Sequence, residues 1–157
     1  MQQNNTKGFR IFIAEARFYQ DISDQLAQGV TAVLDEAGAQ FERVAVPGSF
    51  ELPAAIRFAH DRGCESGGQD SFDGYIALGC VIRGETDHYD HVCRETSRAL
   101  MDLAVQDRLA LGFGLLTCET YDQALIRAKV DGKNRGADAA RACLRMIELR
   151  HGLRGQP

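Results

Sequence analysis

Residues 79–95, GCVIRGETDHYDHVCRE, contain residue types whose spacing could support chemistry. The preceding residues 75–78 (YIAL) have the length and composition of a buried strand, and Gly79 bounds this apolar run. Residues 83–87 (RGETD) then favour a turn, because Gly, Thr and Asp are common in turns. Apolar side chains at three- and four-residue spacing follow, which predicts a helix.

A helix that starts directly after a strand points its first backbone N–H groups at whatever lies beyond the sheet edge. Such an N-terminus attracts phosphates and other anions, because the unpaired donors and the helix dipole both favour negative charge. His88 lies next to this start, and histidine is the side-chain type that commonly transfers protons near neutral pH. The stretch therefore predicts a phosphate site beside a proton-transfer group, and its alternative is a strand-to-helix turn with a solvated histidine.

Three further residues could bind a substrate, and each has an ordinary structural alternative. Phe18 lies in the turn after the first strand, where it could stack on a flat heterocycle or fold onto the core. Glu51 could accept hydrogen bonds from ligand hydroxyls, or it could complement a helix dipole for about 0.3–1 kcal/mol. Arg127 could bind phosphate with its planar charged fork, or it could be a solvated helix residue. The local sequence leaves both interpretations open in all three cases.

Common metal and nucleotide motifs do not occur in the sequence. His88 and His91 form an H-x-x-H pair, but no third ligand of matching spacing is evident, so we expect no metal site. Residues 112–114 begin like a G-x-G fingerprint, yet Thr117 stands where the third glycine belongs and the glycines fall inside a strand. This pattern speaks against dinucleotide binding. Neither G-x-x-x-x-G-K-[ST] nor G-x-S-x-G is found.

The composition indicates one folded domain. With 157 residues, 45% of them hydrophobic and 25% charged, the chain can form a full core and is too apolar for disorder. The net charge of −4 comes without a large basic block, so nucleic acid is not an expected partner. No apolar run approaches the roughly 20 residues of a membrane helix. We expect residues 1–8 to be a flexible polar arm, not a signal peptide, and residues 9–157 to be a single domain.

Cysteine usage bears on the cellular location. The five cysteines are odd in number and form no C-x-x-C pair. They fit reduced thiols in a cytoplasmic protein, several of them as small core residues.

Four apolar segments have the composition of strands, and each is followed by helical periodicity. The expected strands are residues 9–14, 41–46, 75–78 and 109–116. The expected helices are residues 22–37, 49–59, 92–104, 121–129 and 136–150, with a loop at residues 63–73. This alternation predicts an α/β fold with parallel strands and helices on both sheet faces.

Ligands of such folds bind beyond the carboxyl ends of the strands. Four segments are expected there together: residues 17–19, 48–51, 81–88 and 113–117. A four-stranded sheet is small and has two edges, and edges are usually covered, so we expect the chain to associate with other copies of itself.

Several motifs together resemble the lumazine synthase family. The matching segments are Ala16-Arg17-Phe18, residues 46–53 (VPGSFELP), residues 79–88 with VIRGET followed by His88, and residues 114–117 (GLLT) with Gln123-Ala124 and Arg127-Ala128. They span most of the chain in the family's order. The resemblance implies a flavodoxin-like three-layer α/β sandwich with strand order 2-1-3-4. It also implies a homopentamer whose active sites lie between adjacent subunits, small-molecule substrates, and no cofactor.

The family reaction condenses 5-amino-6-(D-ribitylamino)uracil with 3,4-dihydroxy-2-butanone 4-phosphate in riboflavin biosynthesis, and it releases phosphate and water. By resemblance, His88 is the catalytic residue that moves protons. The implied substrate-binding residues are Phe18, Gly48, Ser49, Phe50, Glu51, Cys80, Val81, Ile82, Gly84, Glu85, Thr86, Phe113, Arg127 and Arg135. Phe18 would stack on the pyrimidine, and residues 84–86 would hold the phosphate. Arg127 and Phe113 are expected to come from the neighbouring subunit.

Three positions depart from the family pattern. Tyr19 stands where Asn is frequent, Arg135 replaces a frequent Lys, and Glu85 adds a negative charge beside the expected phosphate. The alternative function is therefore a non-catalytic relative that binds flavin or lumazine, or one that serves as a shell scaffold. Retention of Phe18, Thr86, His88 and Arg127 together favours the enzyme. The sequence leaves pentamer, decamer and icosahedral assemblies open.

Overall fold

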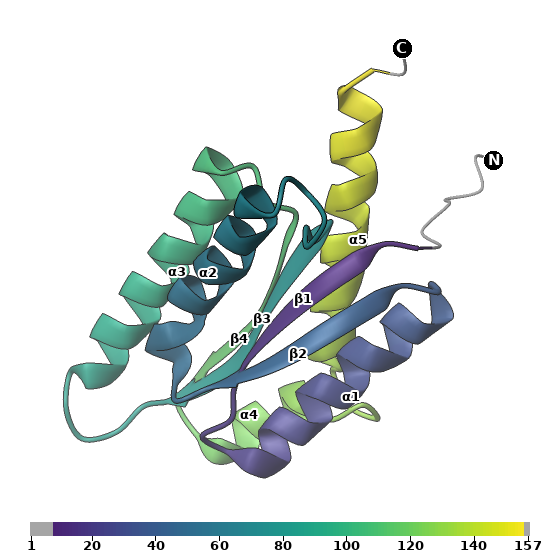
Figure 1. Ribbon diagram of the computed structural model, residues 1–157. Helices are drawn as coiled ribbons and strands as arrows, with labels where there is room; N and C mark the ends of the chain where they lie inside the picture. Colours follow the sequence, from purple (N-terminus) through teal and green to yellow (C-terminus); the bar gives the residue numbers. More distant parts are fainter. Residues whose placement is uncertain (1–7, 156–157) are drawn as a thin grey trace.

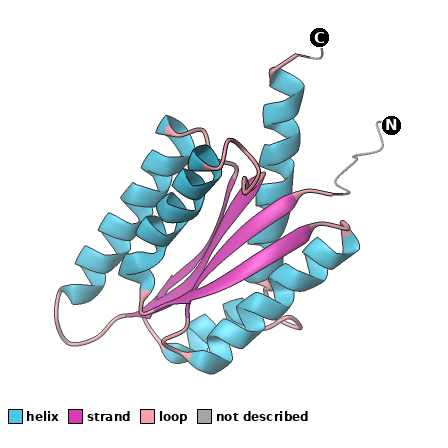
Figure 2. Ribbon diagram, viewed as in Figure 1, coloured by secondary structure: helices cyan, strands magenta, loops and turns pink. Residues whose placement is uncertain are grey.

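Four parallel strands form the middle layer of an α/β sandwich in the computed structural model, which describes residues 8–155 (Figures 1 and 2). The strands are β1 (Arg10–Ala16), β2 (Gln40–Val46), β3 (Gly74–Ile82) and β4 (Leu111–Cys118). Their order across the sheet is β2-β1-β3-β4, with every neighbouring pair parallel. The fold class and strand order expected from the sequence are confirmed.

Helices cover both faces of this sheet, as Figure 1 shows. The helical elements are α1 (Gln20–Glu36), a short 3₁₀ turn η1 (Ser49–Glu51), α2 (Leu52–Glu65), α3 (His88–Gln106), α4 (Tyr121–Ala128) and α5 (Arg135–Leu153). One core cluster joins the sheet to α1, α4 and α5, and a second cluster joins it to α2 and α3.

Alternation along the central strands explains why there are two cores. Successive side chains of a strand point to opposite faces of the sheet. Ile11 and Ile13 of β1 accordingly pack in the cluster of α1 and α5, whereas Phe12 and Ala14 pack in the cluster of α2 and α3. β1 is apolar on both sides because both of its faces are covered by helices.

Several boundaries differ from those expected from the sequence. β3 does not end at Gly79 but continues to Ile82, because residues 79–82 pair with β4. β4 begins two residues later than expected, after a turn in which Arg108 has φ +56°. α2 continues to Glu65, so its last turn occupies the start of the expected loop. Hydrogen bonding to β4 determines where β3 ends, and the sequence alone does not show which strands pair.

The glycines of the G-x-G run on β4 serve close packing. A Cβ at Gly112 would lie 2.2 Å from the carbonyl oxygen of Ala139 in α5. A Cβ at Gly114 would lie 2.5 Å from the side chain of Leu78. Helix α5 therefore approaches β4 more closely than a larger residue at position 112 would allow.

Among the described residues, no helix is both long enough and apolar enough to cross a membrane. The arm expected at residues 1–8 lies outside the described residues, apart from Gly8.

Candidate active site

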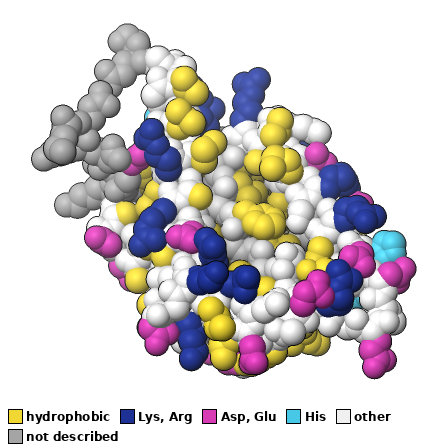
Figure 3. Space-filling view, turned by 180° about the vertical axis from the view of Figure 1, so that it is seen from behind, with side chains coloured by type: hydrophobic (Ala, Val, Ile, Leu, Met, Phe, Trp, Pro, Cys, Tyr) yellow, Lys and Arg dark blue, Asp and Glu magenta, His cyan; other side chains and the backbone are white. Residues whose placement is uncertain are grey.

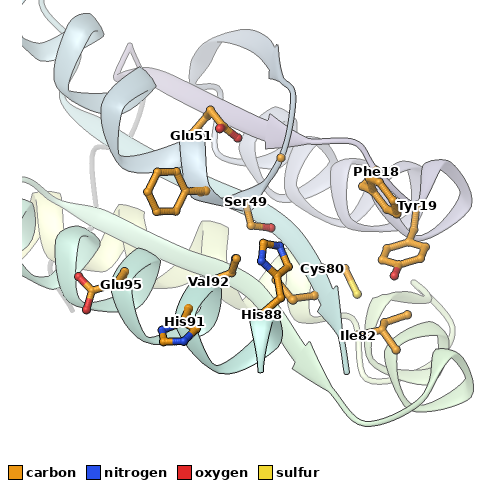
Figure 4. Close-up of a pocket in the computed structure, with 13 residues that line it drawn as sticks. Phe18, Tyr19, Ser49, Glu51, Cys80, Ile82, His88, His91, Val92 and Glu95 are labelled. Carbon is orange, nitrogen blue, oxygen red and sulfur yellow. The ribbon is translucent and has the colours of Figure 1, made fainter. Parts of the chain in front are cut away.

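A pocket of about 650 Å³ lies at the carboxyl ends of the central strands (Figure 4). Its walls come from the β1–α1 turn, η1, the end of β3 and the first two turns of α3. The lining residues are Phe18, Tyr19, Gly48, Ser49, Phe50, Glu51, Cys80, Val81, Ile82, His88, His91, Val92 and Glu95. This is the sheet edge at which the topology predicted a site.

The β1–α1 turn presents two aromatic rings to the pocket. Phe18 is 74% exposed, and its ring lies 5.0 Å from that of Tyr19 in an edge-to-face arrangement. Below the turn, the buried carboxylate of Glu15 accepts hydrogen bonds from Arg17 at 2.9 Å and from Arg43 of β2 at 3.1 Å. Arg17 also bonds Asp24 of α1. This network ties the turn to β2 and α1, and it leaves Phe18 free to stack on a flat ligand.

The segment at η1 is held against the sheet by close packing. Ser49 is 8% exposed, and its main-chain oxygen accepts a hydrogen bond of 3.4 Å from Thr96 of α3. A Cβ at Gly79 of β3 would lie 2.9 Å from the Ser49 hydroxyl oxygen. The glycine therefore lets η1 approach the strand, while the neighbouring Phe50 stays largely exposed at the rim of the pocket.

The end of β3 offers main-chain groups to the pocket. The pairing of β1 with β3 stops at Glu15 opposite Leu78, whereas β4 pairs with β3 up to Ile82. Residues 79–82 thus have a partner strand on one side only within the described chain. The main-chain N–H and C=O groups of these residues on the β1 side face the pocket. They are free to form hydrogen bonds with the polar edge of a ligand ring.

Cys80 contributes an unreactive thiol to this wall. Burial raises its pKa to about 12, because desolvation penalises the thiolate. The thiol therefore stays protonated at neutral pH, and Cys80 is not a nucleophile in this structure. The hydroxyl of Tyr19, whose pKa is also raised by burial, stays protonated as well.

His88 is the first residue of α3, and its ring points into the pocket on the side of Ser49 (Figure 4). The N–H of His88 donates to the Thr86 hydroxyl at 3.4 Å. The N–H groups of residues 84–87 form no hydrogen bond within the described residues. The loop therefore carries unpaired donors at a helix N-terminus, which suits an anion beside the imidazole.

Tyr19 lies in the segment 17–19 that was expected at the strand ends, whereas three further lining residues were not expected from the sequence: His91, Val92 and Glu95. These three lie three, four and seven positions after His88 in α3. Positions with this spacing share one face of a helix. Counting from His88 would therefore have found them.

Six of the expected site residues lie outside this pocket. Gly84, Glu85 and Thr86 are exposed in the loop before α3. Phe113 pairs with Ala77, four residues before Val81, and is therefore about 13 Å from that end of the sheet. The Arg127 guanidinium donates to the Gln123 carbonyl at 2.9 Å, and Arg135 pairs with Asp138 at 2.9 Å. The pocket of a single chain thus lacks these two arginines.

The fold and pocket together define a flavodoxin-like α/β protein. Its pocket at the strand ends combines an aromatic ring, an open helix N-terminus and a histidine. The sequence matches the 6,7-dimethyl-8-ribityllumazine synthase family over residues 8–151, and the chain belongs to that family. The family prediction made from the motifs is confirmed, and so is the classification of the chain as an enzyme, a transferase of riboflavin biosynthesis.

Similar proteins carry this family name. The "6,7-dimethyl-8-ribityllumazine synthase 1" of Rhizobium meliloti is 52% identical over 147 residues, which cover 94% of this chain and 95% of the relative. The synthase of Bartonella tribocorum is 49% identical over 96% of this chain and 95% of its own. That of Methylorubrum extorquens is 47% identical over 96% and 86%. A solved MID domain of Arabidopsis thaliana AGO5 has a TM-score of 0.38 at 11% identity over 93% of this chain and 89% of its own, and carries no argument.

Proposed function

We propose that this protein condenses 5-amino-6-(D-ribitylamino)uracil with 3,4-dihydroxy-2-butanone 4-phosphate, forming 6,7-dimethyl-8-ribityllumazine and releasing phosphate and water. The observation that carries the proposal is the pocket of about 650 Å³, which places an aromatic ring, unpaired strand-end main chain and a histidine around one cavity. Family membership supports the same reaction.

The pyrimidine binds in the part of the pocket built from β1, η1 and β3. Phe18 stacks on the heterocycle, and the main chain of Val81 and Ile82 pairs with its polar edge. Ser49, Phe50 and Glu51 hold the ribityl chain. The support for these roles is that all six residues line one pocket. A stacked ring in a site of this kind contributes about 0.5–1.5 kcal/mol beyond its buried area.

The phosphate of the second substrate binds at the start of α3. The donors are the N–H groups of residues 84–86, and the helix dipole adds to their attraction for an anion. Glu85 is exposed in this loop, so solvent screens its charge. Arg127 from another copy completes the clamp, since the Arg127 of the same chain is bonded to its own helix and does not line the pocket.

His88 moves protons in the reaction. The amine of the pyrimidine attacks the ketone, and Schiff-base formation, loss of phosphate and ring closure follow. Each step needs a proton delivered or removed beside the α3 N-terminus, where the imidazole lies. Much of the acceleration comes from orienting two bound substrates, and the acid–base part is about 10²–10⁴-fold.

The site is shared between two copies of the chain. Phe113 is 48% exposed on β4, the edge strand, and exposed apolar side chains of α3 and α5 share this side of the molecule. Met146, Leu149 and Leu153 of α5 line one hollow together with Ala104 of α3 and Leu109, two residues before β4. Figure 3 shows hydrophobic side chains gathered around a hollow on this side. Contiguous apolar surface of this kind is typical of protein interfaces, and a pentamer brings Phe113 and Arg127 of one copy to the pocket of the next.

The deciding experiment is a turnover assay that follows lumazine absorbance and fluorescence after mixing both substrates with the protein. Acceleration above background, reduced about 10–100-fold by Arg127→Ala, is expected. His88→Ala should slow turnover and leave pyrimidine binding intact. A folded protein without acceleration would contradict the proposal, and it would leave the binding or scaffold alternative.

Sharing of the site has its own test. His88→Ala and Arg127→Ala subunits are unfolded together, mixed in equal amounts and refolded. If the two groups come from different copies, about a quarter of the sites regain both by random association. If activity does not recover on mixing, both groups belong to one chain.

The cellular location proposed is the cytoplasm. The five cysteines are free thiols in the structure, and all five lie in its described part, which supports a reducing compartment.

A further inference from the structure

Arg83 connects the end of the sheet to the first turn of α3. Its Nη1 and Nη2 donate to the two carboxylate oxygens of Asp90 at 3.0 and 3.3 Å. Its Nε donates to Glu119, one residue beyond β4, at 2.9 Å. Its Cζ lies 4.2 Å from the centre of the Tyr89 ring. The backbone N–H of Arg83 donates to the Cys118 carbonyl at 3.0 Å, so the residue is anchored to β4.

These contacts hold the two residues that directly follow His88. Asp90 receives a paired bond from a planar guanidinium, which fixes both distance and orientation. Tyr89 lies under the face of the same guanidinium and also interacts with Thr117 of β4. The loop before α3 has few bonds of its own, the His88 N–H to Thr86 among them. The position of the first turn of α3 therefore depends on Arg83.

We propose that Arg83 is a positioning residue, which fixes the first turn of α3 so that the His88 imidazole points into the pocket. The inference rests on the proposed role of His88 in proton transfer. A misplaced catalytic group can lose as much as about 10²-fold in rate, so the orientation of this turn matters to turnover.

A direct role of Arg83 in binding the phosphate is disfavoured by its charge balance. One guanidinium faces two carboxylates, Asp90 and Glu119, so the cluster is negative as a whole. The hydrogen bond to Asp90 raises the pKa of Arg83, and the same bond lowers the pKa of Asp90. Arg83 and Asp90 thus remain ionised around neutral pH. Because the guanidinium already donates to Asp90 and Glu119, an anion would find little free positive charge here.

The contribution of this cluster to stability should be small. The side chains of Arg83, Asp90 and Glu119 are 38%, 45% and 57% exposed, and exposed ion pairs add little to folding. Arg57 provides a matched control. It is 48% exposed and binds Asp61 at 2.9 Å and Asp107 at 3.2 Å, but it does not line the pocket.

The test is a double-mutant cycle of Arg83→Gln and His88→Ala. Arg83→Gln should lower kcat about 10–100-fold and change the KM for the butanone phosphate less than about threefold. In the His88→Ala background, it should change kcat by less than about twofold, because the group that it positions is gone. Asp90→Asn should reproduce the loss, and Arg57→Gln should leave the kinetics unchanged.

Three results would overturn the inference. An unchanged kcat in Arg83→Gln would do so, and so would the same loss of kcat in both backgrounds. A raised KM at constant kcat would show that Arg83 binds substrate. Amide hydrogen exchange of residues 88–91 gives an independent readout if the wild-type chain shows no turnover. It should speed up in Arg83→Gln and not in Arg57→Gln, and unchanged exchange would contradict the positioning role whatever the reaction is.

Discussion

Replacing Gly79 by alanine should disturb the pocket through one close contact. The added Cβ would lie 2.9 Å from the Ser49 hydroxyl oxygen and 3.2 Å from both Ala16 Cβ and Leu115 Cδ1. Real Cβ contacts below 3.0 Å are essentially never seen, so either the Ser49 hydroxyl must rotate or η1 must move away from β3. Overpacking of this size costs about 1–3 kcal/mol of unfolding free energy.

A gain from the unfolded state opposes part of this loss. Alanine reduces the conformational freedom of the unfolded chain, which stabilises by about 0.4–1 kcal/mol where the backbone permits it. The two opposing terms leave a net destabilisation between about 0 and 2.6 kcal/mol, and we expect about 1.3 kcal/mol in urea unfolding, the difference of their midpoints. Because Ser49 lines the pocket, the Kd for the ribitylaminopyrimidine, measured by calorimetry, should also rise.

Two further variants test the mechanism. Gly152→Ala in α5 has no atom within 4 Å of the added Cβ, so the unfolding free energy should stay equal or rise slightly. Ser49→Ala combined with Gly79→Ala removes the oxygen at 2.9 Å, and it should recover a measurable part of the lost stability. If Gly79→Ala is as stable as wild type and binds the pyrimidine equally well, the close-approach argument is wrong.

Three other predictions concern thiols and buried charge. At pH 8, iodoacetamide should alkylate the exposed Cys64 long before Cys80. The reason is that only about 10⁻⁴ of a thiol with a pKa of about 12 is ionised at this pH. Similar alkylation rates of the two cysteines, measured by mass spectrometry, would refute this. Burial raises the pKa values of Cys80 and Cys143 from 9.0 to about 12. Their contribution to the free energy of unfolding is therefore fully present below about pH 9 and should decrease as the pH rises towards 12. Urea unfolding midpoints measured across this pH range test the decrease. Glu15→Gln should lower the unfolding free energy by about 1–3 kcal/mol, because Arg43 loses its buried carboxylate partner, and an unchanged urea midpoint would contradict this.

Patterns that are local in the sequence predicted most of the fold. The alternation of apolar strands with helical periodicity led to the parallel α/β class, because each crossover helix must return the chain to the same sheet edge. The strand ends were less accurate. Gly79 was taken as the end of a strand, yet it lies inside β3 because β4 pairs with it and η1 packs against it. Glycine in a strand marks either a turn or a close approach, and only the three-dimensional contact distinguishes the two.

The same limit applies to the candidate site. Residues expected at or just after strand ends, such as Phe18, Ser49 and Val81, were placed together by the topology and line one pocket. Arg83 stood within the recognised motif without a role, because its partners Asp90 and Glu119 are separated from it by 7 and 36 residues. Ion pairs between elements depend on how those elements pack. Spacing alone therefore predicted several of the residues that line the pocket and missed what holds them in place.

The pocket is better equipped for one proposed substrate than for the other, and this difference has a structural cause. Residues 79–82 of β3 extend beyond the last residue paired with β1. One chain by itself therefore supplies the groups proposed to bind the pyrimidine: the Phe18 ring, the main chain at the end of β3, and residues 49–51 for the ribityl hydroxyls. At the phosphate end, the described residues supply unpaired N–H groups beside His88, but no arginine or lysine lines the pocket, and Arg83 is bound by Asp90 and Glu119. A dianionic phosphate needs more positive charge than N–H dipoles provide. The proposed reaction therefore requires a cation from outside this pocket. In the proposed assembly, Arg127 of a neighbouring copy would supply it, and the same copy would cover the apolar surface beside β4.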